Sequence, residues 1–225
     1  MNYCQFRNDF IKRMANAGVG GDSDTVLLLQ LNGDINDTSP NHYTPITTGS
    51  ISYVTGYLTG TQAVKITNSG FVHYDNILSI PGDFSLDFFA NYYTSIHELY
   101  WGYYWLHPSI PGYSQYSGLG VSTQLRESIN GKTPNVLFDP INLNTWYHIA
   151  VTRESGVIRM FKNGVLAGSG TPADKDAGLR FDIGYTNFSD SRITYYQNIK
   201  LTKSVRHIES GGVYTFPVPT ELYTN

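Results

Sequence analysis

The sequence predicts an all-β domain preceded by a short helical arm. From residue 26 onward, strand-sized runs alternate with turn signals, and no segment keeps the 3.6-residue period of a helix. A length of 225 residues suits one large β domain with its own hydrophobic core. The chain also has 32 aromatic residues (18 Tyr, 11 Phe and 3 Trp) against 33 charged ones, which indicates a large core or an aromatic contact surface. We therefore expect an arm over residues 1–24 and a β domain over residues 25–225.

The arm is predicted to contain one amphipathic helix, which ends at a glycine-rich linker. Charged residues lie between its apolar ones over residues 5–16, so the apolar side chains form one face. So short a helix is marginally stable alone, and its apolar face must pack either on the β domain or on a partner. If the face docks on a partner, the contact residues are Phe6, Phe10, Ile11 and Met14.

The β domain is predicted to contain at least nine strands in chain order. Trp146–Arg153 has apolar residues on both faces, which indicates a central strand. A tight turn follows at Ser155-Gly156. A second lies at Asn163-Gly164, because both positions of a type I′ turn need positive φ and these residues tolerate it, so Trp146 to Leu166 forms a three-stranded meander. The predicted strands are Val26–Leu31, Gln62–Thr67, Phe84–Tyr93, Leu99–Leu106, Leu119–Glu127, Trp146–Arg153, Val157–Lys162, Leu179–Ile183 and Thr194–Thr202.

The order of several motifs resembles one known superfamily. WYHIAVTR, GVIRMFKNGVLAGSG and YYQNIKLTKSVRH, followed by FPVP, resemble the laminin-G-like branch of the concanavalin A-like lectin/glucanase superfamily. The segment LLLQLNGDINDTSPNHYT is similar to that family's first strand and the turn after it, here Asp37 to Asn41. The similarity spans residues 26–220. It implies a two-sheet antiparallel jelly-roll β-sandwich of the concanavalin A type.

The pairing of LLLQLNGD near the start with KLTKSVRH and FPVP near the end looks most like modules on bacteriophage virion proteins. This resemblance implies a non-enzymatic structural or adhesion protein on the capsid surface or tail. Its partners would be other virion proteins, its location the virion surface, and its outward-facing sandwich would bind host-surface glycans. Sheet edges and aromatic patches favour a homo-oligomer.

Charge and composition exclude several other classes of function. A net charge of -3 and a pI of about 6.0, with no lysine or arginine cluster, argue against nucleic-acid binding. Cys4 is the only cysteine, so an intrachain disulfide and a thiolate zinc site are excluded. We also expect no membrane insertion and no secretory leader, because no segment is long and apolar enough for either.

The alternative of a carbohydrate-active enzyme has little support from the carboxylates. The hydrolases of the superfamily place catalytic carboxylates on one strand as Glu-x-Asp-x-x-Glu, because the reaction needs an acid and a base or nucleophile close together. That pattern is missing, and Asp87 is the only acidic residue on its strand. We therefore expect no catalytic residues.

A calcium-dependent lectin is the second alternative. Oxygen ligands for Ca²⁺ could come from Asp34 and Asp37, or from Asp182 and Asp190. Many relatives carry an acidic pair where this chain has Gln197-Asn198, however, and Asp37 before Thr38-Ser39 is typical of turn capping. The histidines have no metal-ligand spacing, so His148 is interpreted as structural and no cofactor is expected.

A tyrosine- and tryptophan-rich segment is the predicted contact surface. Residues 91–118 alternate so that aromatic side chains occur on both faces of one strand, and only one face can fill the core. Rings with a polar edge suit contact with sugars or with a protein. The alternative is that all of them pack beneath the loop His107–Gly118. The candidate contact residues are Trp101, Tyr103, Tyr104, Trp105, Tyr113 and Tyr116.

Overall fold

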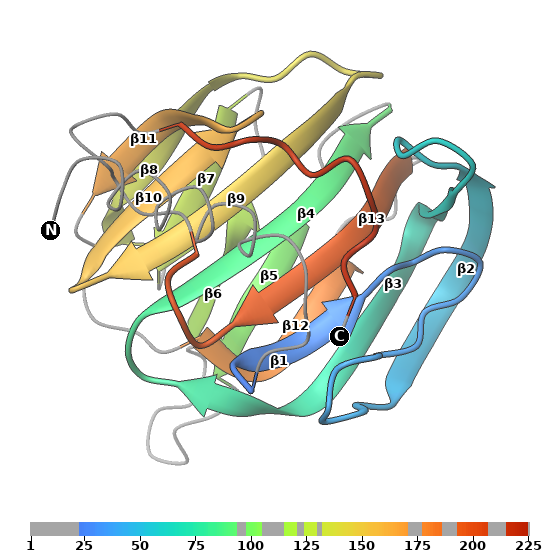
Figure 1. Ribbon diagram of the computed structural model, residues 1–225, viewed down its shortest axis with the longest axis horizontal. Helices are drawn as coiled ribbons and strands as arrows, with labels where there is room; N and C mark the ends of the chain where they lie inside the picture. The colour runs from blue at the N-terminus through green and yellow to red at the C-terminus, as the bar shows by residue number, and fades with distance from the viewer. Residues whose placement is uncertain are drawn as a thin grey trace, which may run out of the picture.

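The computed structural model shows a domain built from antiparallel β-strands arranged in two layers (Figure 1). It describes residues 23–93, 98–104, 115–120, 124–129, 132–170, 177–185, 193–206 and 215–224. The strands are β1 (Thr25–Leu29), β2 (Pro45–Thr55), β3 (Gln62–Ile80), β4 (Phe84–Tyr92), β5 (Glu98–Tyr104), β6 (Gln115–Gly120), β7 (Gln124–Ile129), β8 (Lys132–Pro140), β9 (Trp146–Glu154), β10 (Val157–Lys162), β11 (Val165–Gly170), β12 (Ala177–Tyr185) and β13 (Ile193–Thr202).

Hydrogen bonds join the strands in the order β11-β10-β9-β4-β13-β3-β12-β5-β6-β7-β8, with β1 paired to β13 and β2 paired to β3. The 19-residue strand β3 belongs to both layers, because its first part pairs with β13 and its later part with β12. In Figure 1, β9, β4 and β13 cross in front of β5 and β6. This arrangement is the predicted jelly-roll sandwich.

The core lies between the layers and follows the two-residue period of the strands. On β4, Leu86, Phe88, Ala90 and Tyr92 are buried among apolar side chains of the core. Ala90 pairs with Tyr147 of β9 and Tyr196 of β13, and those two rings also belong to the core. The residues between them, such as Asp87 and Asn91, therefore lie on the outer face of the front layer.

Both predicted tight turns are confirmed, and φ is positive at both positions of each. Ser155 and Gly156 have φ values of 49° and 79°, and Asn163 and Gly164 have values of 51° and 77°. Strand β9 is buried along its length and pairs with β4 on one side and β10 on the other, as a central strand should. The meander from Trp146 onward is therefore correct.

Several strand boundaries differ from the prediction. The predicted strand Leu119–Glu127 is wrong, because β6 and β7 form two antiparallel strands there. Strands β2 and β8 were not predicted, and β3 continues well past Thr67. The sequence of β2 does not alternate clearly between apolar and polar residues, because most of its side chains are exposed and uncharged.

The predicted arm helix and its contact residues Phe6, Phe10, Ile11 and Met14 lie outside the described residues. Within the described ranges, no helix has the length and apolar character to cross a membrane.

Candidate functional site

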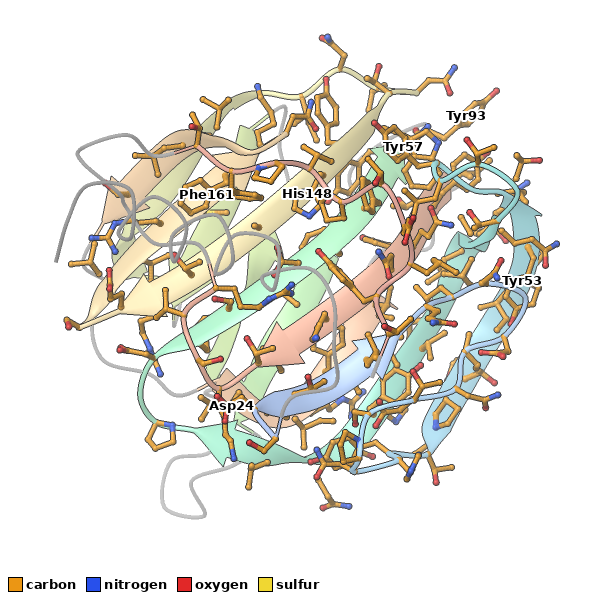
Figure 2. All side chains as sticks on the ribbon, viewed as in Figure 1. Asp24, Tyr53, Tyr57, Tyr93, His148 and Phe161 are labelled. Atoms are coloured by element: carbon orange, nitrogen blue, oxygen red, sulfur yellow. The ribbon has the colours of Figure 1, made fainter. Side chains whose placement is uncertain are left out.

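The outer face of the front layer has a covered part and an open part. The segment 215–224 runs back over β9, β4 and β13 and covers one part (Figures 1 and 2). Aromatic rings at the other end of the same strands remain partly exposed. The covered part holds charged side chains and the open part holds aromatic ones.

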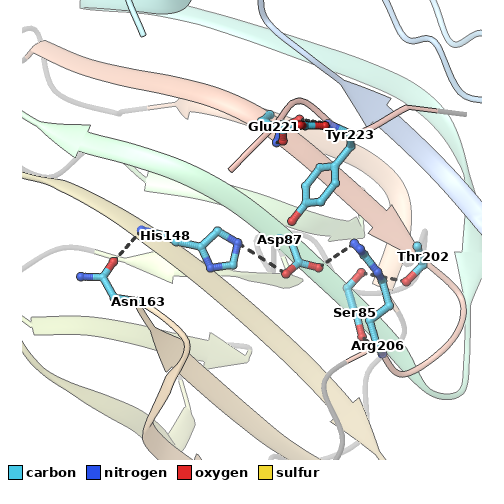
Figure 3. Close-up of polar contacts among 9 residues, drawn as sticks. Ser85, Asp87, His148, Asn163, Thr202, Arg206, Glu221 and Tyr223 are labelled. Atoms are coloured by element: carbon cyan, nitrogen blue, oxygen red, sulfur yellow. Dashed lines mark hydrogen bonds and ion pairs between the residues drawn. The ribbon is translucent and has the colours of Figure 1, made fainter. Parts of the chain in front are cut away.

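The covered part holds a buried cluster of charged and polar side chains (Figure 3). Asp87 on β4 is 0% exposed, and its carboxylate lies 3.1 Å from Nη1 of Arg206 and 3.7 Å from Nε2 of His148. The ring of Tyr223 lies 4.9 Å from the guanidinium carbon of Arg206. Burial, and then the nearby charge of Asp87, raise the pKa of the Tyr223 hydroxyl above its ordinary value. Because the carboxylate is enclosed, water and saccharides do not reach it.

The segment 215–224 is held onto this cluster by hydrogen bonds and rings. Tyr223 donates its backbone N–H to Oδ1 of Asn198 at 2.7 Å and accepts at its carbonyl from Nε2 of Gln30. Near its start, the segment packs the Phe216 ring against His148 and Phe161. The Phe216 ring thus covers His148, and Arg206 pairs with Asp87, so both side chains are packed inside the domain, as the structural interpretation of His148 expects.

Gln197 braces the loop that connects β2 to β3. Its Oε1 accepts hydrogen bonds from the backbone N–H groups of Tyr57 and Leu58, at 3.0 and 3.3 Å. Its Nε2 donates to Oγ1 of Thr61 at 2.5 Å and to the Gln62 carbonyl at 2.7 Å. A Cβ atom on Gly56 would collide with this amide, so a side chain at position 56 would displace Gln197 from its present place. Gln197 therefore fixes this loop through a neutral side chain.

The open part is a contiguous aromatic surface. Trp146 on β9 and Tyr195 on β13 both pair with Asn91 of β4, so the three residues form one row across adjacent strands. The Trp146 and Tyr195 ring centroids are 6.2 Å apart. Tyr93, which is 43% exposed, lies 5.9 Å from Tyr195.

The loop braced by Gln197 completes this surface. Tyr57 is 48% exposed, and its ring stacks on Phe89 at 4.8 Å and lies 6.2 Å from Trp146. Figure 2 places Tyr57 and Tyr93 at the same corner of the molecule. We call the set Tyr57, Tyr93, Trp146 and Tyr195 the aromatic surface.

The predicted contact residues lie on a different part of the chain. Residues 101, 103 and 104 are on β5, and residue 116 is on β6, where its backbone pairs with that of Tyr103. Trp105 and Tyr113 lie outside the described residues. The structure therefore brings Tyr103 and Tyr116 into register, and the prediction that this segment forms a contact surface stays a prediction.

Three members of the aromatic surface were not predicted from the sequence. Trp146 was assigned only to a strand with two covered faces, and Tyr57 and Tyr195 were not singled out. A signal for Tyr57 exists in its segment GYLTG, where two glycines flank a short loop with a central aromatic residue. Trp146 and Tyr195 are brought together by the register of strands that are distant in the chain. The local sequence around each residue does not contain that register.

The carboxylates considered for calcium are engaged in other contacts. Oδ1 of Asp37 accepts from the backbone N–H groups of Leu28 and Ser39, and its Oδ2 accepts from Ser39 Oγ and the Tyr43 N–H. This pattern confirms the turn-capping interpretation. Asp34 accepts from the backbone of Asn36 at the surface.

Asp182 on β12 is buried beside Arg180, at 2.9 Å from its Nε, and Asp190 lies outside the described residues. Burial raises the pKa of Asp182 to about 6, although Arg180 favours the charged form. Across the described ranges, no three His, Cys, Asp or Glu side chains form a group that could hold a metal ion.

Comparison with known proteins identifies the family. The family model of the concanavalin A-like lectin/glucanases superfamily matches residues 67–194, which is more than half of the chain. The chain belongs to the concanavalin A-like lectin/glucanase superfamily. None of the curated proteins is significantly similar to it.

Solved structures with a similar fold include binding domains of botulinum neurotoxins. The binding domain of botulinum neurotoxin DC in complex with SialylT has a TM-score of 0.60 and 14% identity, over 81% of this chain and 48% of that one. The serotype C1 binding domain has a TM-score of 0.57 and 15% identity, over 80% and 49%. The chain thus spans about half the length of these structures. At such identities the similarity shows the lectin-like fold alone.

Proposed function

We propose that the protein is a non-enzymatic binding module that holds glycans on the aromatic surface. The observation that carries this proposal is the contiguous set Tyr57, Tyr93, Trp146 and Tyr195 on an open part of a lectin-like sandwich. Tyrosine and tryptophan rings bury a large area at low conformational cost, and their polar edges can bond to hydroxyl groups. These are the properties needed to bind the apolar face of a sugar ring.

Similar structures support a binding role rather than a catalytic one. One of them belongs to botulinum neurotoxin type C, whose cell entry depends on interaction with two ganglioside molecules. Another is the botulinum neurotoxin DC binding domain in complex with rat synaptotagmin II. In this chain, Asp87 is enclosed with His148 and Arg206, which favours a structural role over glycoside hydrolysis. The glucanase alternative would gain support from turnover of a polysaccharide.

The test of glycan binding compares two places on the chain. The purified protein is applied to a glycan array, and Trp146→Ala is compared with Trp101→Ala, the candidate from the sequence. We expect wild type to bind at least one class of glycan without cleaving it, and Trp146→Ala to lose at least tenfold in affinity. Equal binding by wild type and Trp146→Ala with loss in Trp101→Ala would assign the site to the candidate residues around Trp101 on β5. No binding to any glycan would contradict the proposal.

We also propose that the module is attached to a bacteriophage particle through its arm. Support comes from the resemblance of its first and last motifs to virion modules, together with the apolar set Phe6, Phe10, Ile11 and Met14 in the arm. Partners would be other virion proteins, in a symmetric assembly at the particle surface.

Incorporation into particles tests this attachment. Phe10→Ala with Ile11→Ala should reduce the copies of the protein on purified particles, whereas Asp9→Ala with Lys12→Ala, on the polar face, should not. Unchanged incorporation of the first pair would contradict docking through the arm.

A further inference from the structure

The row of residues that carries Trp146 and Tyr195 continues to a lysine. Tyr195 pairs with Lys65 of β3, which in turn pairs with Ser52 of β2. Val64 and Ile66, on either side of Lys65, are buried in the core, so Lys65 lies on the outer face with Tyr195. The aromatic surface therefore has a positive charge next to it.

Among the described residues, Lys65 has no ion pair or hydrogen bond through its side chain. The cations of the covered part differ, because Arg206 lies against Asp87 and Tyr223. Lys65 is partly exposed, and its ammonium has no carboxylate partner among the described residues, so it is available to an anionic group of a ligand.

A second polar group lies within the row. Asn91 is 5% exposed, and its Oδ1 has no hydrogen-bond partner among the described residues. A buried acceptor without a donor costs free energy, and such groups in native proteins call for an explanation. Asn91 lies between Trp146 and Tyr195 in the row. When one of these two rings moves aside, a ligand hydroxyl group can reach Oδ1 of Asn91 and donate the missing hydrogen bond.

The length of the row limits the size of the ligand. Trp146 and Lys65 are three strand spacings apart, or about 14 Å at the usual separation of neighbouring strands. That length suits a short oligosaccharide better than a single sugar. A chain that stacks on the rings and carries an anionic group at one end would place this group beside Lys65.

We infer that the aromatic surface binds an anionic oligosaccharide, whose sugar faces stack on Trp146 and Tyr195 and whose carboxylate or phosphate group pairs with Lys65. This inference rests on the proposed function and adds the ligand's charge to it. Carboxylate and phosphate share the same chemistry at Lys65, so the experiment includes both.

The test uses calorimetry with three probes: an oligogalacturonate, its methyl ester and a phosphorylated oligosaccharide. Wild type should bind at least one anionic probe at least tenfold more tightly than the neutral ester, with affinity falling as salt rises. Lys65→Gln should remove this preference without changing affinity for the ester. Lys203→Gln, which removes an exposed charge elsewhere, should keep it.

Each other outcome separates the two proposals. Equal affinity for the ester and both anionic probes, with loss of all binding in Trp146→Ala, would overturn the role of Lys65 and leave glycan binding intact. Equal losses in Lys65→Gln and Lys203→Gln would show a general charge effect and would also overturn it. Absence of binding to all three probes and to the glycan array would overturn both.

Discussion

Asn198 accepts a 2.7 Å hydrogen bond from the backbone N–H of Tyr223 and so fixes the returning segment 215–224 to β13. The φ of Asn198 is 55°, at an irregularity in the pairing of β13 with β4. Asparagine tolerates this left-handed conformation better than most residues. A local distortion of the strand thus aims an amide at the segment that covers the buried charges.

Truncation of Tyr223 should destabilise the whole domain. The side chain is 1% exposed, and Tyr223→Ala should lower the free energy of unfolding by about 3–5 kcal/mol, as for other buried aromatic residues. Urea unfolding measures the change. Tyr223→Phe keeps the ring beneath Arg206 and should retain most of the stability. If Tyr223→Phe lost as much free energy of unfolding as Tyr223→Ala, the effect would belong to the hydroxyl group instead.

Loss of the amide of Gln197 should affect both stability and ligand binding. Gln197→Ala leaves the Tyr57 and Leu58 N–H groups without their acceptor, which should cost about 1–3 kcal/mol. Since Tyr57 belongs to the aromatic surface, glycan affinity should fall as well. Thr61→Ala, which removes one of the four contacts, should cost about 1 kcal/mol by chemical denaturation. Unchanged glycan affinity in Gln197→Ala would show that the loop does not contribute to the site.

Replacement of Asp37 separates a structural carboxylate from a calcium ligand. Asp37→Ala removes the acceptor for Leu28, Ser39 and Tyr43 and should cost about 3 kcal/mol, whether or not calcium is present. Asp34→Ala, at an exposed position, should cost less than about 0.5 kcal/mol. Tight Ca²⁺ binding by calorimetry that disappears in Asp37→Ala would instead favour the calcium-dependent lectin.

The pH dependence of stability should contain a contribution from Asp182. Its pKa is about 6 in the folded protein and 3.8 for the unperturbed group, so the folded state binds more protons between these values. Stability from this group is therefore present below about pH 4 and is lost as pH rises to about 6, by about 3 kcal/mol.

Asp182→Asn isolates this contribution, because other carboxylates titrate in both proteins. The difference in unfolding free energy between the variant and wild type should shift in favour of the variant from pH 4 to pH 7. The absolute difference also includes the lost ion pair with Arg180, so the change with pH is the quantity to compare. A difference that stays constant with pH would contradict a raised pKa.

The sequence predicted the features of the fold that depend on residues close together in the chain. Asn163 and Gly164 specify their turn because few other residues adopt positive φ, and the even burial of β9 follows from apolar residues on both faces. Strand β2 lacked such a signal. It lies next to β3 alone among the described strands, so its threonines and serines need not alternate with apolar residues.

Strand β3 and the aromatic surface show a different limit. Thr67-Asn68-Ser69-Gly70 looks like a turn in the sequence, but β3 continues through it because β2 and β12 pair with the residues beyond. The aromatic surface depends on a row that joins residues 91, 146 and 195, and this register is set by the fold as a whole. The capping role of Asp37 was predictable because its main partners are close in sequence.

The brace on the loop from Gly56 to Thr61 also bears on how specificity could diversify. Gln197 bonds to main-chain atoms at positions 57, 58 and 62, so it does not select the side chain at position 57. Under the proposed function, substitutions at position 57 would change the ligand contacts while the framework strands keep their sequence. A saturation library at Tyr57 is accordingly a direct route to variants with new ligand preferences.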